Sequence, residues 1–294
     1  MAVELFLVDE GNEFQQLLRD EAVTAASRTG LSLKTTFTGD DFSAQLAQIR
    51  RCAARKPEAI LVMSVRDRGL VRVTAEAMRE GVHWVFLNRT EDETDDLRRQ
   101  YPKVALTTVC PDEVETGRIQ GRLIKTLLPA GTKALYVQGS RRSLAARDRT
   151  VGVESALAGT GTDLVPIEAG WSAAQGRDAV RDWLRVAGRT GIRLGLVGAQ
   201  SDLIATGALE ALESVSAEIG RPELKSVPVI GCDGTPGLGQ RLVREGRLKA
   251  TVTLPRWTGI AVETIARTLK SGLLPPPLVT VTGSSFPPED QVRR

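Results

Sequence analysis

Short apolar runs alternate with longer amphipathic stretches along the whole chain, and this alternation restricts the fold more than any other feature. The runs 3–8, 59–65 and 194–197 are rich in valine, leucine and isoleucine, as buried strands are. The stretches between the runs have helical spacing, so that Ile204 and Ala208 share one helix face. Such alternation produces βαβ units and parallel sheets that are covered on both faces. We therefore expect an α/β protein with doubly wound parallel sheets.

The two halves of the chain are similar to each other. Residues 59–64 (AILVMS) and 194–201 (LGLVGAQS) are both apolar runs followed by a serine. Residues 83–89 (HWVFLNR) and 227–234 (VPVIGCDG) are both strand-like runs whose ends carry asparagine or aspartate. In open α/β sheets, ligands bind outside the carboxyl ends of the strands. We expect two such lobes to line one shared cleft with short polar side chains, because clefts between domains commonly bind small ligands.

Composition excludes several classes of function. The 294 residues are enough for two domains, and the net charge of +3 is too small and too evenly spread for a nucleic-acid-binding chain. Three widely spaced cysteines make neither a disulfide framework nor a zinc site. The single histidine, His83, excludes most histidine-based metal sites and begins a predicted buried strand, so we expect it to be structural. We expect no metal and no cofactor.

No export or membrane-spanning segment is visible. The apolar run at 3–8 is short and has no basic region before it. No stretch approaches the roughly 20 apolar residues of a transmembrane helix. Two locations stay open: the periplasm or cell envelope if a signal was trimmed, and the cytoplasm if this chain is the full gene product.

Seven segments, taken in order, resemble the type I periplasmic sugar-binding proteins. The nearest group is that of the ribose- and galactose-binding members, which share their fold with the effector domain of LacI-type repressors. The resemblance extends from about residue 3 to about residue 282. Its segments are 12–22 (NEFQQLLRDEA), 60–64 (ILVMS), 86–89 (FLNR), 139–157 (GSRRSLAARDRTVGVESAL), 200–212 (QSDLIATGALEAL), 229–236 (VIGCDGTP) and 248–255 (LKATVTLP).

The resemblance implies two discontinuous lobes joined by a three-segment hinge near residues 108, 254 and 279. The N-terminal lobe would comprise residues 1–108 plus 255–278, and the C-terminal lobe residues 109–254 plus 279–294. Hinge closure would bury a monosaccharide between the lobes. The implied ligand contacts are Asn12, Phe14, Ser64, Asn88 and Arg89 in the first lobe, and Arg147, Trp171, Ser201, Asp233 and, across a one-residue gap, Thr253 in the second.

The chemistry of these residues suits a sugar. Flat aromatic side chains cover the apolar C–H faces of a sugar ring, and planar amide, carboxylate and guanidinium groups bond its hydroxyl pairs. Asn88 stands where the family commonly has aspartate, and Ser64 and Ser201 stand where ribose binders often have asparagine. We therefore expect a pocket that is roomier and less acidic than a ribose site, without naming the sugar.

Plainer interpretations apply to some of these residues. Helical spacing alone favours a core position for Phe14, whereas the resemblance favours a ligand contact. Asp233 begins a good turn sequence. Arg141 and Arg142 are expected to be solvated surface charges rather than a phosphate clamp. Trp257 is interpreted as an interlobe or surface residue.

Three hypotheses about function follow. The leading one is a non-enzymatic, monomeric receptor for a monosaccharide that delivers it to an ABC permease or a chemoreceptor. The second is a cytoplasmic sugar or sugar-phosphate sensor, a LacI-like effector module; no helix-turn-helix precedes residue 3, so this chain alone would not read DNA. The third, an α/β enzyme acting on sugars, is disfavoured because the implied site has one carboxylate, no histidine and no metal cluster.

Overall fold

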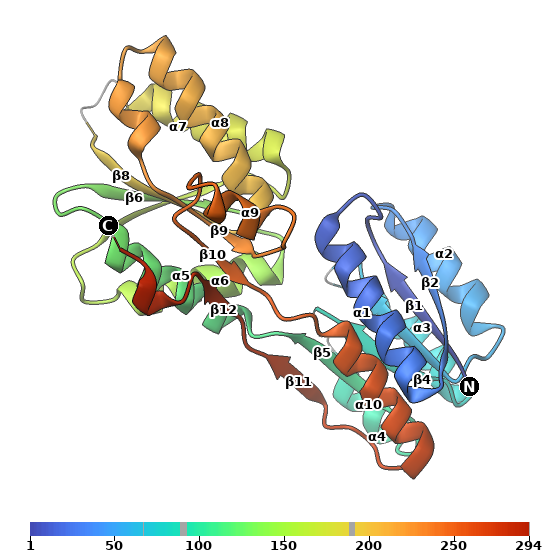
Figure 1. The fold of residues 1–294 in the computed structure, drawn as a ribbon. Coiled ribbons are helices and arrows are strands. Elements are labelled where there is room, and N and C mark those ends of the chain that lie inside the picture. Colours follow the sequence, from blue (N-terminus) through green and yellow to red (C-terminus); the bar gives the residue numbers. More distant parts are fainter. Residues whose placement is uncertain (67, 89–92, 188–191, 294) are drawn as a thin grey trace. The chain divides into compact units, whose positions relative to one another are not determined.

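The computed structural model describes residues 1–66, 68–88, 93–187 and 192–293. Its internal contacts divide the chain into two compact units (Figure 1). The first unit comprises residues 1–111 and 255–281, and the second comprises residues 112–254 and 282–294. The chain therefore passes between units at 111/112, 254/255 and 281/282, where the resemblance implied 108/109, 254/255 and 278/279.

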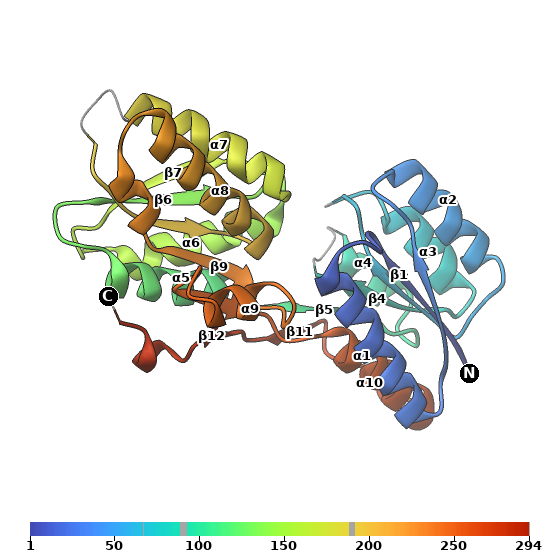
Figure 2. The same cartoon turned by 45° about the horizontal axis from the view of Figure 1, so that its top comes forward.

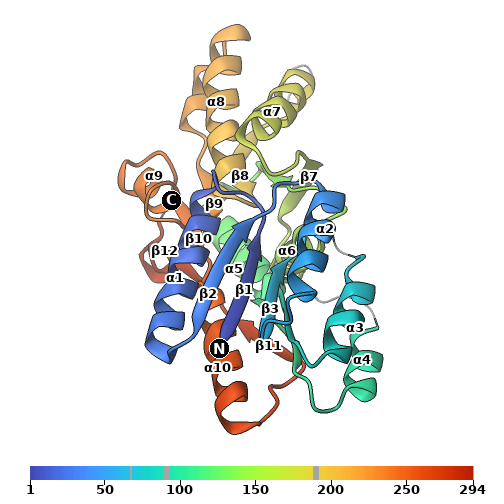
Figure 3. The same cartoon turned by 90° about the vertical axis from the view of Figure 1, so that its right-hand side faces the viewer.

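The first unit is built on a six-stranded sheet of order β11-β5-β4-β3-β1-β2, in which every pairing is parallel. Helices α1 and α10 pack together on one face and α2 and α3 on the other (Figure 3). The strands are β1 (Ala2–Leu7), β2 (Ser32–Phe37), β3 (Ala59–Met63), β4 (His83–Leu87), β5 (Leu106–Pro111) and β11 (Leu278–Val281); the helices are α1 (Glu13–Thr29), α2 (Phe42–Ala53), α3 (Val71–Arg79), α4 (Thr94–Gln100) and α10 (Thr258–Ser271).

Local sequence explains where these elements begin and end. Asn12 and Asp41 accept hydrogen bonds from the first turns of α1 and α2, which is the usual role of an N-cap. Gly30 ends α1 with a φ of 76°, a left-handed conformation that glycine adopts without strain. Strand β3 is buried along its whole length, which matches its uninterrupted apolar sequence.

The second unit also has a six-stranded sheet, of order β12-β10-β9-β8-β6-β7. Helices α5 and α6 pack together on one face and α7 and α8 on the other (Figure 2). The strands are β6 (Lys133–Gln138), β7 (Asp163–Glu168), β8 (Leu194–Ala199), β9 (Val229–Asp233), β10 (Ala250–Thr253) and β12 (Ser284–Phe286); the helices are α5 (Glu113–Leu127), α6 (Leu144–Leu157), α7 (Ala173–Ala187), α8 (Asp202–Glu218) and α9 (Gly239–Arg244), with short 3-10 turns at Pro222–Ser226 and Glu289–Gln291.

The two sheets have the same strand order, so the prediction of two similar α/β halves is confirmed. Strands β3 and β8 occupy equivalent places, as do β4 and β9. One strand departs from the expected parallel arrangement: β12 pairs with β10 in the antiparallel direction at the sheet edge. Within the part of the chain that the structure describes, no helix combines the length and the apolar character needed to cross a bilayer.

Candidate functional site

Polar side chains gather at the carboxyl edge of the first sheet. Asn12 follows β1 and caps α1, with its Oδ1 accepting from the Gln15 N–H at 3.2 Å. Ser64 follows β3 and is 2% exposed. Asn88 follows β4 with a φ of 74°. Because β1, β3 and β4 are neighbouring parallel strands, these three expected residues lie at one edge. Arg89 lies outside the described residues.

Phe14 lies in the first turn of α1 and is partly exposed. Its ring centroid is 5.5 Å from that of Trp257, at an interplanar angle of 48°. Trp257 is only 1% exposed and is packed inside the first unit, so its interpretation as a surface residue is wrong. Phe14 is therefore supported from within its own unit while part of its surface stays open.

In the second unit, the expected residues lie at or after the ends of five parallel strands. Arg147 lies in α6 after β6, Trp171 follows β7, and Ser201 follows β8. Asp233 and Thr253 are the last residues of β9 and β10. The fold thus brings all five segments to the carboxyl edge of the second sheet.

Two of these hydroxyls take part in the scaffold. The Ser201 hydroxyl caps α8 by accepting from the Ile204 N–H at 3.1 Å, and the residue is 4% exposed. The Thr253 hydroxyl donates to the Ser284 carbonyl oxygen at 2.8 Å, which fastens β10 to β12. The cap uses only the acceptor side of Ser201, so its hydroxyl proton is available to a ligand.

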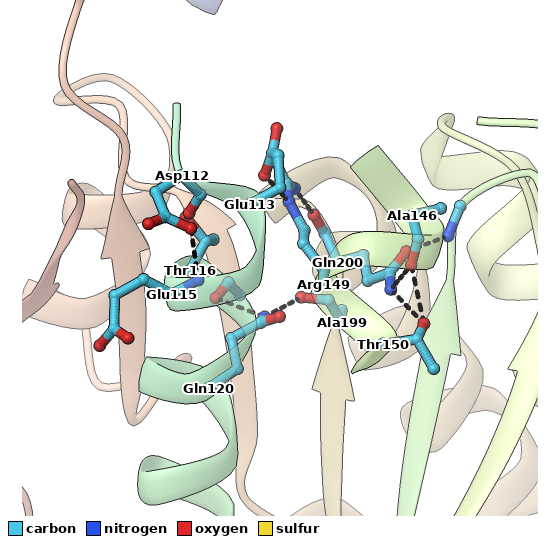
Figure 4. A network of polar contacts seen from close by, with 12 residues as sticks. Asp112, Glu113, Glu115, Thr116, Gln120, Ala146, Arg149, Thr150, Ala199 and Gln200 are labelled. Atoms are coloured by element: carbon cyan, nitrogen blue, oxygen red, sulfur yellow. Dashed lines mark hydrogen bonds and ion pairs between the residues drawn. The ribbon is translucent and has the colours of Figure 1, made fainter. Parts of the chain in front are cut away.

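The two arginines of α6 lie in opposite surroundings. Arg147 is exposed, whereas Arg149 is 4% exposed. The Arg149 guanidinium donates from Nε to Glu113 Oε2 at 2.6 Å and from Nη2 to Glu113 Oε1 at 3.2 Å (Figure 4). Its Nη1 donates to the Gln200 carbonyl oxygen. Its Cζ lies 5.8 Å from the Trp171 ring centroid, so Arg149 lies beside the expected aromatic residue.

Sequence reasoning did not identify Arg149 or Glu113 as site residues, but helical periodicity contained the signal for Arg149. Ala146 and Val153, one turn to either side of it, are buried. Val151, one turn after Arg147, is 54% exposed. Arg149 therefore lies on the apolar face of α6 and Arg147 on its solvent face.

Two glycines bring Glu113 and Arg149 together. A Cβ on Gly117 would lie 2.0 Å from the Arg149 carbonyl oxygen, and one on Gly152 would lie 2.0 Å from the Val114 carbonyl oxygen. Helices α5 and α6 therefore touch backbone to backbone. This contact places the first residue of α5 within ion-pair distance of the middle of α6.

A second buried carboxyl group, that of Asp202, lies close to Asp233. Asp202 is 1% exposed, and it accepts from the Gly234 N–H at 2.8 Å and the Thr251 hydroxyl at 2.7 Å. Burial raises the pKa of Asp202 well above its usual value, and the charge of Asp233 raises it further. Burial also raises the pKa of Asp233 to about 7, although the positive charge of Arg149 opposes this.

The backbone is strained at corresponding points of the two sheets. Asp233 has a φ of 105° and Asn88 a φ of 74°, and both residues end the equivalent strands β9 and β4. Residues other than glycine rarely adopt a positive φ, and strained backbone is concentrated at functional sites. This strain marks both strand ends as candidates for ligand contact.

The edge of each sheet carries groups that can hydrogen-bond a ligand. The two edges offer hydroxyl, amide, carboxylate and guanidinium groups next to aromatic rings, the combination that recognises polyhydroxylated ligands. Among the described residues, no group of three or more histidine, cysteine, aspartate and glutamate side chains is arranged to hold a metal ion. His83 begins β4, away from the carboxyl edge, and its Nδ1 accepts from the Ala105 N–H at 2.8 Å.

Comparisons with known proteins agree with this geometry. The family described as "Periplasmic binding protein domain" matches residues 3–269. The protein named "Putative rhizopine-binding protein" of Rhizobium meliloti is 30% identical over 229 residues, which cover 76% of this chain and 70% of that protein. The ribose import binding protein RbsB of Escherichia coli (strain K12) is 25% identical over 262 residues, which cover 88% of this chain and 81% of that protein.

A solved structure shows the same fold. It is the periplasmic binding protein component of the arabinose ABC transporter from Shewanella sp. ANA-3, bound to alpha and beta-L-arabinofuranose. Its TM-score is 0.82 at 22% identity, and the match covers 97% of this chain and 91% of that one. The chain therefore belongs to the periplasmic binding protein family, in the type I sugar-binding group that its seven segments resemble.

Proposed function

We propose that this protein is the solute receptor of a sugar importer and that it binds one free monosaccharide without changing it. The observation that carries this proposal is the group formed by Arg149, Asp233 and Trp171 at the carboxyl edge of the second sheet. The names of the relatives support the ligand class and the transport role, since one is a ribose import binding protein.

Each member of this group has a distinct task in the proposal. The indole of Trp171, which is 36% exposed, stacks on a C–H face of the sugar, and such stacking contributes about 1 kcal/mol beyond the buried area. The Asp233 carboxylate accepts from two neighbouring hydroxyls. Arg149 uses three N–H groups for Glu113 and Gln200, and a guanidinium has two more that can donate to the sugar.

The first unit also contributes to sugar binding in this proposal. Asn12 and Asn88 bond ring hydroxyls through their amide groups, and Ser64 does so through its hydroxyl. Phe14 covers an apolar face of the ring, since its own surface is partly open. Arg89, Arg147, Ser201 and Thr253 complete the set that the family resemblance implies, and we assign the principal arginine role in the second unit to Arg149.

The partner and location follow from the same proposal. The protein acts as a monomer in the periplasm and delivers its sugar to an ABC permease, with a chemoreceptor as the other candidate partner. Family members are binding proteins rather than enzymes, and we infer that this chain also releases its ligand unchanged. The alternative of a sugar-phosphate sensor would use Arg141 and Arg142, which are both exposed, and the Arg141 Nε lies 3.6 Å from Glu168 Oε2.

A thermal-shift panel of free pentoses, free hexoses and their phosphates tests this proposal. A ligand present at 100 times its Kd adds about 2.7 kcal/mol of stability, which a melting curve resolves. We expect stabilisation by one free monosaccharide and recovery of that sugar unchanged after incubation. Stabilisation by phosphorylated sugars alone would support the cytoplasmic sensor, conversion of the sugar would establish an enzyme, and the absence of any shift would contradict the sugar-receptor function.

A further inference from the structure

Gln200 is a fully buried side chain at the end of β8, with 0% exposure. Its Oε1 accepts from the Gly139 N–H at 2.9 Å. Its Nε2 donates to the Ala146 carbonyl oxygen at 2.9 Å and to the Thr150 hydroxyl at 3.1 Å (Figure 4). One amide group therefore joins the end of β8 to the loop after β6 and to the first turns of α6.

These bonds hold Arg149 from two directions. Ala146 and Thr150 flank Arg149 on α6, so the side-chain bonds fix the part of the helix that carries the guanidinium. The Gln200 backbone carbonyl accepts from Nη1 of the same guanidinium. The helix segment and the charged group are thus both anchored to one residue.

The third hydrogen bond of the Gln200 amide is with Gly139, whose backbone contacts the Trp171 ring. A Cβ on Gly139 would lie 2.3 Å from Cζ2 of the Trp171 ring, so the indole rests directly on the Gly139 backbone. The hydrogen bond from the Gly139 N–H to Gln200 Oε1 fixes the position of that backbone. A shift of Gly139 would therefore move the indole.

We propose that Gln200 is a positioning residue that holds Arg149 and Trp171 in the geometry that binds the sugar, without contacting the sugar itself. The inference rests on the proposed sugar-binding function. Groups that bind a ligand lose affinity when their supporting hydrogen bonds are removed, because small displacements weaken directional contacts.

Gln120 provides a matched control. It is also 0% exposed and lies in the second unit. It donates to the Ala199 carbonyl oxygen at 2.7 Å and the Gly231 carbonyl oxygen at 3.3 Å, and it accepts from the Tyr136 hydroxyl at 2.8 Å. Its hydrogen bonds go to strands of the second sheet and not to α6 or Gly139. Gln200→Met and Gln120→Met remove comparable bonds from comparable surroundings at similar side-chain length.

The experiment has two arms. In the first, calorimetry measures the Kd of the parent and both variants for D-ribose, L-arabinose, D-galactose and D-allose. We expect Gln200→Met to weaken the tightest of these sugars about tenfold or more and Gln120→Met to stay within about twofold, at similar losses of melting temperature. In the second, acrylamide quenching of tryptophan fluorescence is measured without sugar. We expect greater quenching for Gln200→Met only, and no such increase when Trp171→Phe is also present.

The results distinguish a positioning role of Gln200 from a general effect on stability. Equal losses of affinity in both variants, or parent-like affinity in Gln200→Met, would overturn the inference. If the parent binds none of the four sugars, the panel of pentoses, hexoses and phosphates decides the proposed function, while the quenching arm still tests whether Gln200 holds Trp171. Unchanged quenching in Gln200→Met would then reject the positioning of Trp171.

Discussion

The two units share one strand order but differ in what they bury at the carboxyl edge. The buried polar side chains described in the first unit, such as Thr38, Gln45 and Ser64, are neutral. The second unit buries three ionisable groups, those of Glu113, Arg149 and Asp202. Burying charge costs several kcal/mol per ion unless it is well paired, and in the second unit Arg149 is paired with Glu113. In the proposed function, the second unit therefore supplies the electrostatic part of sugar recognition.

The same contrast appears in two buried glutamines. In the first unit, Gln45 Nε2 donates to the Met63 carbonyl oxygen at 3.0 Å, and its Oε1 accepts from the Val65 N–H at 2.9 Å. It thereby holds the backbone on both sides of Ser64. In the second unit, Gln200 also fixes the start of a helix that carries a buried charge. A buried glutamine thus supports the backbone at the carboxyl edge of each sheet, next to neutral side chains in the first unit and next to Arg149 in the second.

The helix pairs of the two units also meet differently. In the second unit, Gly117 and Gly152 allow α5 and α6 to touch through their backbones, and Gly207 does the same for α7 and α8. In the first unit, the Thr258 hydroxyl on α10 donates to the Leu18 carbonyl oxygen on α1 at 2.6 Å. The close contacts of the second unit are what make the Glu113–Arg149 pair possible.

The largest expected effect separates Arg149 from Arg147. Arg149→Met leaves Glu113 buried without its partner, which should lower the free energy of unfolding by about 3–5 kcal/mol and abolish sugar binding. Arg147→Met, on the exposed face of the same helix, should change stability by about 0.5 kcal/mol or less. Urea unfolding and calorimetry measure both quantities. Tighter sugar binding by the Arg149 variant than by the Arg147 variant would reverse our assignment.

A single methyl group tests the difference in helix packing. Gly152→Ala places a Cβ against the Val114 backbone and should cost about 1–3 kcal/mol of unfolding free energy. Gly259→Ala in the first unit meets only the flexible Glu21 side chain, at 2.9 Å, and should be close to neutral. Chemical unfolding of the two variants makes the comparison; equal losses would contradict the backbone contact between α5 and α6.

Titration of Asp233 should make both the stability of the protein and its affinity for the sugar depend on pH. Because its pKa is raised to about 7 in the folded protein, the native state holds an extra proton between the usual carboxyl pKa and pH 7. This contribution to stability is therefore present at low pH and is lost as the pH rises through 7. Sugar binding should show the opposite dependence, since the ionised carboxylate accepts hydroxyl protons: affinity should fall up to about tenfold per pH unit below 7.

Asp202→Asn sharpens this test. Burial and the charge of Asp233 raise the pKa of Asp202 well above its usual value, so Asp202 is neutral while Asp233 titrates. Replacing it with asparagine removes no charge, and the affinity midpoint should stay close to that of the parent. Asp233 also interacts with Arg149, Glu113 and Cys232. All three residues are unchanged in this variant. Calorimetry between pH 5.5 and pH 8.5, values chosen to bracket a pKa of about 7, measures the midpoint. A flat profile in the parent would contradict a titrating Asp233.

The smallest expected effect compares the two aromatic side chains. Trp171→Leu should weaken sugar binding by about 1 kcal/mol with little change in stability, because the indole is already 36% exposed. Phe14→Leu should weaken binding to a similar degree and also lower stability, since its ring packs on Trp257. Melting and calorimetry separate the two cases. Loss of stability without loss of affinity in Phe14→Leu would show that Phe14 is a core residue and not a ligand contact.

Local patterns in the sequence determined much of this protein. Apolar periodicity predicted the strands and helices, and the serine, asparagine and aspartate residues that end the runs predicted which segments reach the carboxyl edges. Such features depend on near neighbours along the chain, and a period of two or of about 3.6 residues is visible without any tertiary information. The family resemblance then implied candidate contacts at those ends, which the described structure locates except for Arg89.

Only the tertiary structure decided which charges are buried. Helical periodicity places Arg149 on the apolar face of α6, but the approach of α5 to α6 at Gly117 and Gly152 is what encloses it and pairs it with Glu113. Asp202 reads as an ordinary first-turn helix residue until β9, β10 and the following loop enclose it. Burial and pairing are set by segments that meet from far apart in the chain, and a charge takes its pKa and its role from those distant neighbours.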